Sequence, residues 1–284
     1  MLFAPKNQKI IGLDISDTAV KLLELSGGIN KGGKQSTKVK VEHYAVCPLP
    51  AGSVVEKNII EPEAVADAIS QAVRKSGTRT RRAAVAVGGS STITKYISLP
   101  AGLSQRQLEQ QVEVEAESHI PFPIEEVSLD FEVLGPKRDD PDMLNILLAA
   151  ARSDIVDARV TALELAGLEA GVVDLEIFAL ENACSLLAHQ MLTGKPGAKA
   201  DRTKGPDDGK VHVAVVDVGS STTSLTVLEN GRPVYTRDQQ FGGMALTEEI
   251  MQHYELSFEE AGFTKKSGKM PKGVTEEAYF AEVL

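Results

Sequence analysis

The sequence predicts an α/β protein that contains two units, and three observations support this prediction. A hairpin with a polar turn occurs in residues 9–25, and a second hairpin of the same design begins at residue 211. Residues 83–87 form an uninterrupted apolar run, as expected of a strand that is buried on both faces of a sheet. Segments with the apolar spacing of amphipathic helices lie between the predicted strands.

The first unit begins with three predicted strands and a helix. In residues 9–25, two apolar or alternating runs flank a polar turn at residues 14–18. Residues 39–46 alternate again after a turn rich in Gly, Lys and Ser, and they predict a third strand. A helix is expected from Pro62 to Gly77, because Pro suits a first helical turn and Gly commonly ends a helix. Its apolar face comprises Val65, Ala68, Ile69, Ala72 and Val73.

Residues 88–170 form a separate α+β segment, which we expect to be inserted into the first unit. Ser104 and the glutamine three residues later have the spacing of a capping box in front of a helix. Residues 127–150 contain two strand-like runs around a polar turn, which predicts a hairpin. Ser153 is expected to cap a second helix, and Gly167 is expected to close it.

The remaining chain completes this organisation. A strand at residues 172–175 and a helix to about Met191 return to the first unit. The expected domains are residues 1–87 with 171–193, an insert at 88–170, a linker at 194–210 and a second domain at 211–284. A helix expected to begin near Thr275 is still running at Leu284, so we expect an incomplete second domain with exposed apolar surface.

The composition argues against several classes of protein. With 30 Lys and Arg against 40 Asp and Glu, the net charge of −10 opposes non-specific binding to nucleic acid. Cys47 and Cys184 are far apart in the sequence, which argues against a disulfide framework and fits a reducing compartment. The amino terminus lacks a signal-peptide core, and no run approaches the roughly 20 apolar residues that cross a bilayer. We therefore expect a cytoplasmic protein.

The two polar turns are the candidate functional site. Asp217 to Thr222 align in order with residues 14–19, so the chain repeats its opening. Small residues let backbone N–H groups approach anionic oxygens, hydroxyl groups add donors, and an aspartate at a strand end can hold Mg²⁺ through water. The same residue types are the commonest turn formers, so either turn alone is also typical of an ordinary hairpin. Their repetition favours two turns that enclose a polyphosphate.

Three further segments have two readings each. Lys21 can return toward the phosphates, or it can be a solvated strand lysine. Residues 241–247, which include Gly243, resemble a loop whose helix helps to cover a nucleotide, and a simple strand-to-helix turn explains them equally well. Residues 28–34 have the spacing of a P-loop, but Gln35 replaces the Ser or Thr and a strand pattern follows, so we attribute this match to chance.

With these residues located, the chain resembles the actin/Hsp70/sugar-kinase superfamily and, within it, the PilM family of type IV pilus assembly. The resemblance covers nearly the whole chain and rests on residues 11–25, 115–123 and 217–222. It implies an actin-like, ribonuclease H-like two-domain fold with an FtsA-like inserted subdomain, and ATP with Mg²⁺ between the domains. It also implies a groove beside the insert for the cytoplasmic amino-terminal tail of PilN, other pilus-machine partners, a homo-oligomer or ring, and a place beneath the inner membrane.

Site residues follow from the resemblance position by position. The first phosphate motif is matched by Asp14, Ser16, Thr18 and Lys21, and the second by Asp217, Gly219, Ser220, Ser221 and Thr222. Lys265 matches a ribose-side lysine. From the motif chemistry given above, Asp14 and Asp217 would hold Mg²⁺ through water, and Gly243 would contact the nucleotide. Three departures, Ser16 for Gly, an added Asp17, and Gly262 for Glu, imply a reduced affinity.

Three functions are compatible with this family. A nucleotide-responsive scaffold, with at most weak ATPase activity, is favoured. A kinase of the sugar-kinase type would need a general base, and no carboxylate in the sequence stands out in that role. An FtsA-like membrane tether would need a carboxy-terminal amphipathic helix, which the sequence as it stands does not have.

Overall fold

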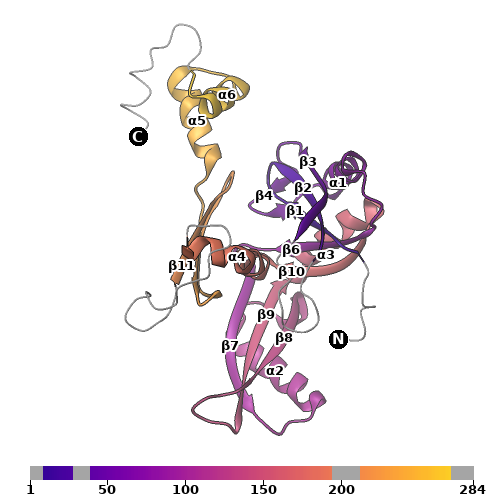
Figure 1. The fold of residues 1–284 in the computed structure, drawn as a ribbon, viewed down its shortest axis with the longest axis vertical. Helices are drawn as coiled ribbons and strands as arrows, with labels where there is room; N and C mark the ends of the chain where they lie inside the picture. Colours follow the sequence, from indigo (N-terminus) through magenta and orange to yellow (C-terminus); the bar gives the residue numbers. More distant parts are fainter. Residues whose placement is uncertain (1–8, 28–38, 194–211, 270–284) are drawn as a thin grey trace. The chain divides into compact units, whose positions relative to one another are not determined.

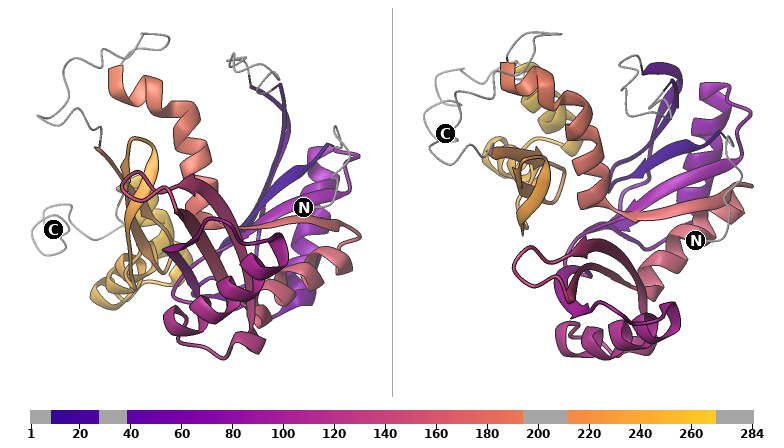
Figure 2. Two further views of the ribbon diagram at one scale, coloured as in Figure 1. Left: turned by 90° about the horizontal axis from the view of Figure 1, so that it is seen from below. Right: turned by 60° about the horizontal axis from the view of Figure 1, so that its bottom comes forward.

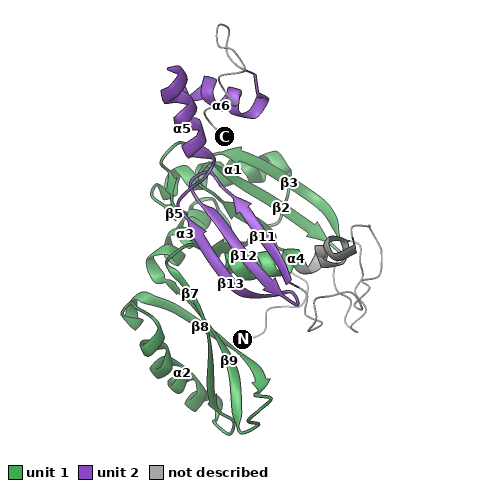
Figure 3. Cartoon of the chain, turned by 90° about the vertical axis from the view of Figure 1, so that its left-hand side faces the viewer, with its two compact units in different colours: residues 1–200 green, residues 201–284 purple. Residues whose placement is uncertain are grey.

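The computed structural model describes residues 9–27, 39–193 and 212–269, without the side chains of residues 185–193. The chain divides into two compact units, residues 1–200 and 201–284 (Figures 1 and 3). The residues of the P-loop-like match and of the helix expected near Thr275 lie outside the described residues.

A five-stranded sheet forms the centre of the first unit. Its strand order is β10-β6-β1-β2-β3, with β1, β6 and β10 parallel and the β1–β2–β3 meander antiparallel. The strands span Ile11–Ile15 (β1), Ala19–Ser26 (β2), Lys40–Pro48 (β3), Arg82–Val87 (β6) and Glu169–Leu175 (β10). Parallel strands place their carboxyl ends at one edge of a sheet, and this edge positions the first candidate turn.

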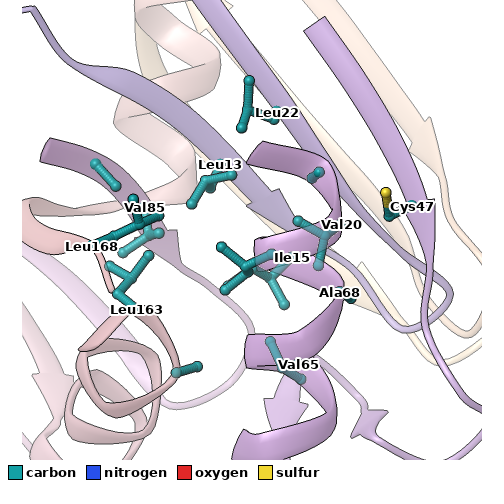
Figure 4. Close-up of a cluster of buried hydrophobic side chains, with 14 of the residues drawn as sticks. Leu13, Ile15, Val20, Leu22, Cys47, Val65, Ala68, Val85, Leu163 and Leu168 are labelled. Carbon is teal, nitrogen blue, oxygen red and sulfur yellow. The ribbon is translucent and has the colours of Figure 1, made fainter. Parts of the chain in front are cut away.

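Helices α1 (Pro62–Ser76) and α3 (Ser153–Leu165) supply the apolar side chains that cover one face of this sheet. Figure 4 shows Leu13, Ile15 and Val20 of the hairpin pointing toward side chains of both helices. Full burial of each such aliphatic side chain stabilises the fold by about 1.5–3 kcal/mol. The alternation along β1 leaves Gly12 and Asp14 exposed on the opposite face.

A two-residue hairpin precedes α1. Strands β4 (Val54–Val55) and β5 (Asn58–Ile59) pair across a turn made by Glu56 and Lys57. Both turn residues have positive φ, 49° and 67°, a conformation in which Asn and Gly are the usual residues. Because neither residue is Gly or Asn, the turn requires support from its surroundings.

The insert has its own sheet and its own core. Strands β7 (Thr92–Pro100), β9 (Met143–Arg152) and β8 (Val127–Pro136) pair antiparallel in that order, and the short 3₁₀ helix η1 (Ile124–Glu126) precedes β8. Helix α2 (Gln105–His119) covers one face through Leu108, Val112 and Ala116 (Figure 2). Ser104 and Gln107 form the predicted capping box, with both reciprocal hydrogen bonds.

One predicted cap is wrong, and the strands β4, β5, β7 and β13 (Arg232–Gln239) were not predicted. Arg152, rather than Ser153, occupies the N-cap position of α3. Strand β9 continues to Arg152, which pairs with Val127 of β8, and Ser153 is already part of the helix. The Ser153 hydroxyl lies 3.2 Å from that of Ser128 instead of capping the helix. Strands β7 and β13 lack a clear alternation of apolar and polar residues.

Helix α4 (Glu176–Thr193) follows β10 directly. In the second unit, β11 (His212–Val218), β12 (Thr223–Glu229) and β13 form an antiparallel sheet. Helices α5 (Gly243–Tyr254) and α6 (Phe258–Ser267) pack together, with Ile250 and Ala261 fully buried. Val216, Val218, Phe241 and Phe263 are each more than half exposed. Apolar surface of this extent is typical of a face that contacts another element or a partner.

Candidate nucleotide site

The first polar turn presents a charged pair on the open face of the five-stranded sheet. Asp14 and Lys21 are opposite one another in the hairpin, and Lys21 Nζ lies 2.7 Å from Asp14 Oδ2. Both side chains are more than half exposed, so the pair adds at most about 1 kcal/mol to stability. Both groups are accessible to a ligand.

Ser16 and Thr18 have local roles in this turn. The backbone N–H and the hydroxyl of Ser16 both donate to the Ala19 carbonyl oxygen, at 3.1 and 3.0 Å. The Thr18 carbonyl oxygen accepts the N–H of Leu49, which follows β3. The residues predicted for the first motif therefore do lie together, but the Ser16 hydroxyl already closes the turn.

The carboxyl ends of the three parallel strands bring further residues to the same edge. Asp17 follows β1, Gly88 and Gly89 follow β6, and Glu176 follows β10. A Cβ atom on Gly88 would lie 2.9 Å from Cγ of Glu176 and closer still to its carboxylate, so a larger residue would require the Glu176 side chain to move. Ligands of open α/β sheets bind at this edge.

Lys57 joins these strand ends through three different groups. Its backbone N–H donates to Asp17 Oδ1 at 3.1 Å, its carbonyl oxygen accepts from Arg159 Nη2 at 2.8 Å, and its ammonium lies 2.6 Å from Glu176 Oε2. The strained turn of β4–β5 is therefore held from both sides. Lys57 links the first polar turn to the first residue of α4.

Arg159 is the buried support of this arrangement. Its side chain is 1% exposed, and Nε donates to the Ala86 carbonyl oxygen at 2.7 Å. Burial lowers the pKa of the Arg159 guanidinium, and the Glu176 carboxylate partly opposes this shift. Lys57, Arg159 and Glu176 were not predicted as site residues, because only the fold brings them together. The position of Glu176 directly after a predicted strand was the one available signal.

The second polar turn is built around close backbone contacts with α5. The N–H of Gly219 donates to the Thr222 carbonyl oxygen at 2.9 Å, and the N–H groups of Gly243 and Met244 donate to Gly219 and Ser220 at 2.9 and 2.8 Å. A Cβ atom on Gly242 would lie 2.7 Å from the Gly219 carbonyl oxygen and closer still to that of Ser220. The absence of a side chain at Gly242 therefore lets the turn and the helix meet.

Lys265 lies beside this turn. Its ammonium donates to the Gly243 carbonyl oxygen and to Thr247 Oγ1, both at 2.6 Å. Burial, and then the neighbouring Lys266, lower the pKa of Lys265. The second unit thus brings together Gly219, Ser220, Gly243 and Lys265, and the Asp217 side chain is exposed at the end of β11. The Gly243 N–H already donates to the Gly219 carbonyl oxygen. In this arrangement Gly243 can therefore contact a ligand only through van der Waals contacts and not through a hydrogen bond from its N–H.

The residues present fit a polyphosphate with Mg²⁺ in their chemistry. Each turn offers one exposed aspartate, small residues and hydroxyl groups, and a lysine lies near each turn. Across the described ranges, no group of three or more His, Cys, Asp or Glu side chains is arranged to hold a metal ion directly.

Comparison with known proteins places the chain in a family. The family model of the type IV pilus assembly protein PilM matches residues 12–281. A solved PilM–PilN type IV pilus biogenesis complex is similar over 91% of this chain and 69% of that chain, with a TM-score of 0.69 and 29% identity.

The cell division protein FtsA of Bacillus subtilis is 22% identical over 92% of this chain, which spans only 55% of the length of FtsA. No helix in the described ranges combines the length and hydropathy that crossing a bilayer requires. The actin-like α/β fold predicted from the sequence is confirmed by these matches. The chain belongs to the family of the type IV pilus assembly protein PilM.

Proposed function

We propose that this protein is a cytoplasmic, nucleotide-binding scaffold of type IV pilus assembly that binds the cytoplasmic amino-terminal tail of PilN. The observation that supports this proposal most is the similarity to a PilM–PilN complex, which extends over 91% of the chain. The proposal places the protein at the cytoplasmic face of the inner membrane, held there by its partners.

The open face of the insert sheet is the surface that we assign to the peptide. Alternation places Ile97 and Ile146 against α2, and it places Tyr96, Leu147 and Glu132 on the opposite face. The Tyr96 side chain is 58% exposed. An exposed aromatic residue and an acidic residue on either side of Leu147 suit a peptide that has both apolar and basic residues.

ATP with Mg²⁺ is the ligand that we assign to the two polar turns. Asp14, Lys21 and Asp217 are exposed, and Lys265 adjoins the second turn. We assign the protein at most a weak ATPase activity. Replacing Asp217 by Ala should weaken the binding of Mg-ATP in isothermal titration calorimetry and leave the melting temperature nearly unchanged, because this side chain is exposed. An unaltered affinity would remove Asp217 from the site.

A pull-down tests the partner and the surface together. A synthetic peptide with the amino-terminal sequence of PilN from the same organism should retain the full chain. Tyr96→Ala should reduce retention strongly, whereas the matched change Tyr44→Ala, at a 71% exposed tyrosine of β3, should leave it unchanged. Equal retention of both variants would move the peptide to another surface. Phosphorylation of a sugar without any peptide would instead favour a kinase of the same superfamily.

A further inference from the structure

The ion pair between Lys57 and Glu176 occupies a position where a ligand would compete for it. Both residues lie at the edge formed by the carboxyl ends of β1, β6 and β10, where ligands of open α/β sheets bind. The Lys57 backbone is hydrogen-bonded to Asp17 of the first polar turn. A phosphate group bound at this turn would therefore be a neighbour of Lys57.

The backbone of Lys57 is fixed by hydrogen bonds, whereas its ammonium group is bound through an ion pair on a flexible side chain. Positive φ angles at Glu56 and Lys57 are maintained by the hydrogen bonds to Asp17 and Arg159. Strained backbone that is held by its surroundings is concentrated at functional sites. The side chain of Lys57 is 23% exposed and ends on a flexible four-carbon stem. Its current partner, Glu176, is itself 36% exposed.

Glu176 is a carboxylate at the first residue of a helix, where the helix dipole favours a negative charge. Gly88 leaves space for it, and it lies against Lys57 rather than in solution. An incoming phosphate would meet two negative groups, Asp17 and Glu176. The affinity for this phosphate increases most if the Lys57 ammonium group turns from Glu176 to the phosphate.

We propose that Lys57 is a phosphate-binding residue of the nucleotide site and that Glu176 competes with the phosphate for its ammonium group. The ion pair then acts as a latch between the first polar turn and α4. Nucleotide binding releases Glu176 at the start of α4. This inference rests on the proposed binding of a nucleotide at the first turn.

Opposite effects of two neutralising substitutions distinguish this latch from a purely structural ion pair. Titrations of Mg-ATP and of tripolyphosphate into the full chain should show about fivefold weaker binding for Lys57→Gln, because a charge-assisted hydrogen bond to phosphate is lost. Glu176→Gln should bind about threefold more tightly, because the competitor is removed. The gain from Glu176→Gln should shrink in the Lys57→Gln background, since the two residues act on one bond.

Matched controls separate these effects from general charge changes and from misfolding. Lys95→Gln and Glu117→Gln alter exposed residues of the insert and should change affinity less than about twofold. Lys57→Arg retains the positive charge and should bind phosphate nearly as well as the wild type. This variant tests the role of the charge even if Lys57→Gln is poorly folded.

Two failures have different meanings. If the wild-type chain binds neither probe, the nucleotide part of the proposed function is wrong and the latch falls with it. If the wild type binds but both neutralising variants weaken binding, or neither alters it, the inference alone is overturned and the pair is a structural link.

Discussion

Replacing Gly242 by Ala tests the construction of the second polar turn. Gly242 has φ −157° and ψ −172°, an extended conformation that alanine adopts without backbone strain. The added Cβ would nevertheless overlap the carbonyl oxygens of Gly219 and Ser220. Because these atoms belong to the backbone, the turn and the start of α5 must move apart.

The magnitude follows from the contacts that this movement breaks. Overpacking by one methyl group costs about 1–3 kcal/mol. The two hydrogen bonds from Gly243 and Met244 to the turn, at 2.9 and 2.8 Å, each contribute about 0.5–1.5 kcal/mol. Reduced freedom of the unfolded chain returns about 0.4–1 kcal/mol. The structure around the new methyl group is expected to relax partly and to keep some of these hydrogen bonds, so we expect a net destabilisation of about 1–3 kcal/mol.

Native-state hydrogen exchange measures this effect locally, through the opening free energies of the amides of β11, β12 and α5. Gly262→Ala is the matched control, since no atom lies within 4 Å of its added Cβ inside α6. That change should stabilise the helix by up to about 1 kcal/mol, because alanine is the better helix former. Equal shifts of the same sign for both variants would refute the close contact at Gly242.

Three further changes test other parts of the fold. Ser104→Ala removes the cap of α2 and should cost about 1 kcal/mol in urea unfolding of the insert; no change would mean that the capping box is not formed. Leu163→Ala empties a fully buried position and should cost about 2–5 kcal/mol; a loss below 1 kcal/mol would contradict its burial. Hydrogen bonds from Ser257 lower the pKa of Glu260, so the stabilisation they give is present above the unfolded value of 4.5 and is lost as the pH falls through the lower folded value. In Glu260→Gln, the opening of α6 should therefore lose its pH dependence below about 4.5, and an unaltered acid profile would contradict the assigned cause.

The sequence predicted those parts of the fold whose signals are local. Both hairpins, α1, the capping box at Ser104 and the buried strand β6 follow from alternation, spacing and end residues within short segments. Ser153 shows the limit of such signals, because the preceding strand continues farther than its own pattern indicates.

The candidate site was predicted only in part. The residues of each turn are adjacent in sequence, so their clustering could be foreseen. Lys57 meets Glu176 across 119 residues and Arg159 across 102 residues, and no sequence motif contains these pairs. Their meeting depends on the parallel order of β1, β6 and β10, which is a property of the topology rather than of any segment.

Binding of the PilN tail is the central claim, and an anisotropy titration tests it most directly. A fluorescently labelled peptide with the amino-terminal sequence of PilN would be titrated with the full chain, with and without Mg-ATP. We predict saturable binding, with a dissociation constant that differs between the two conditions. Absence of saturation in both conditions would contradict the scaffold role, and identical constants would contradict only its dependence on nucleotide.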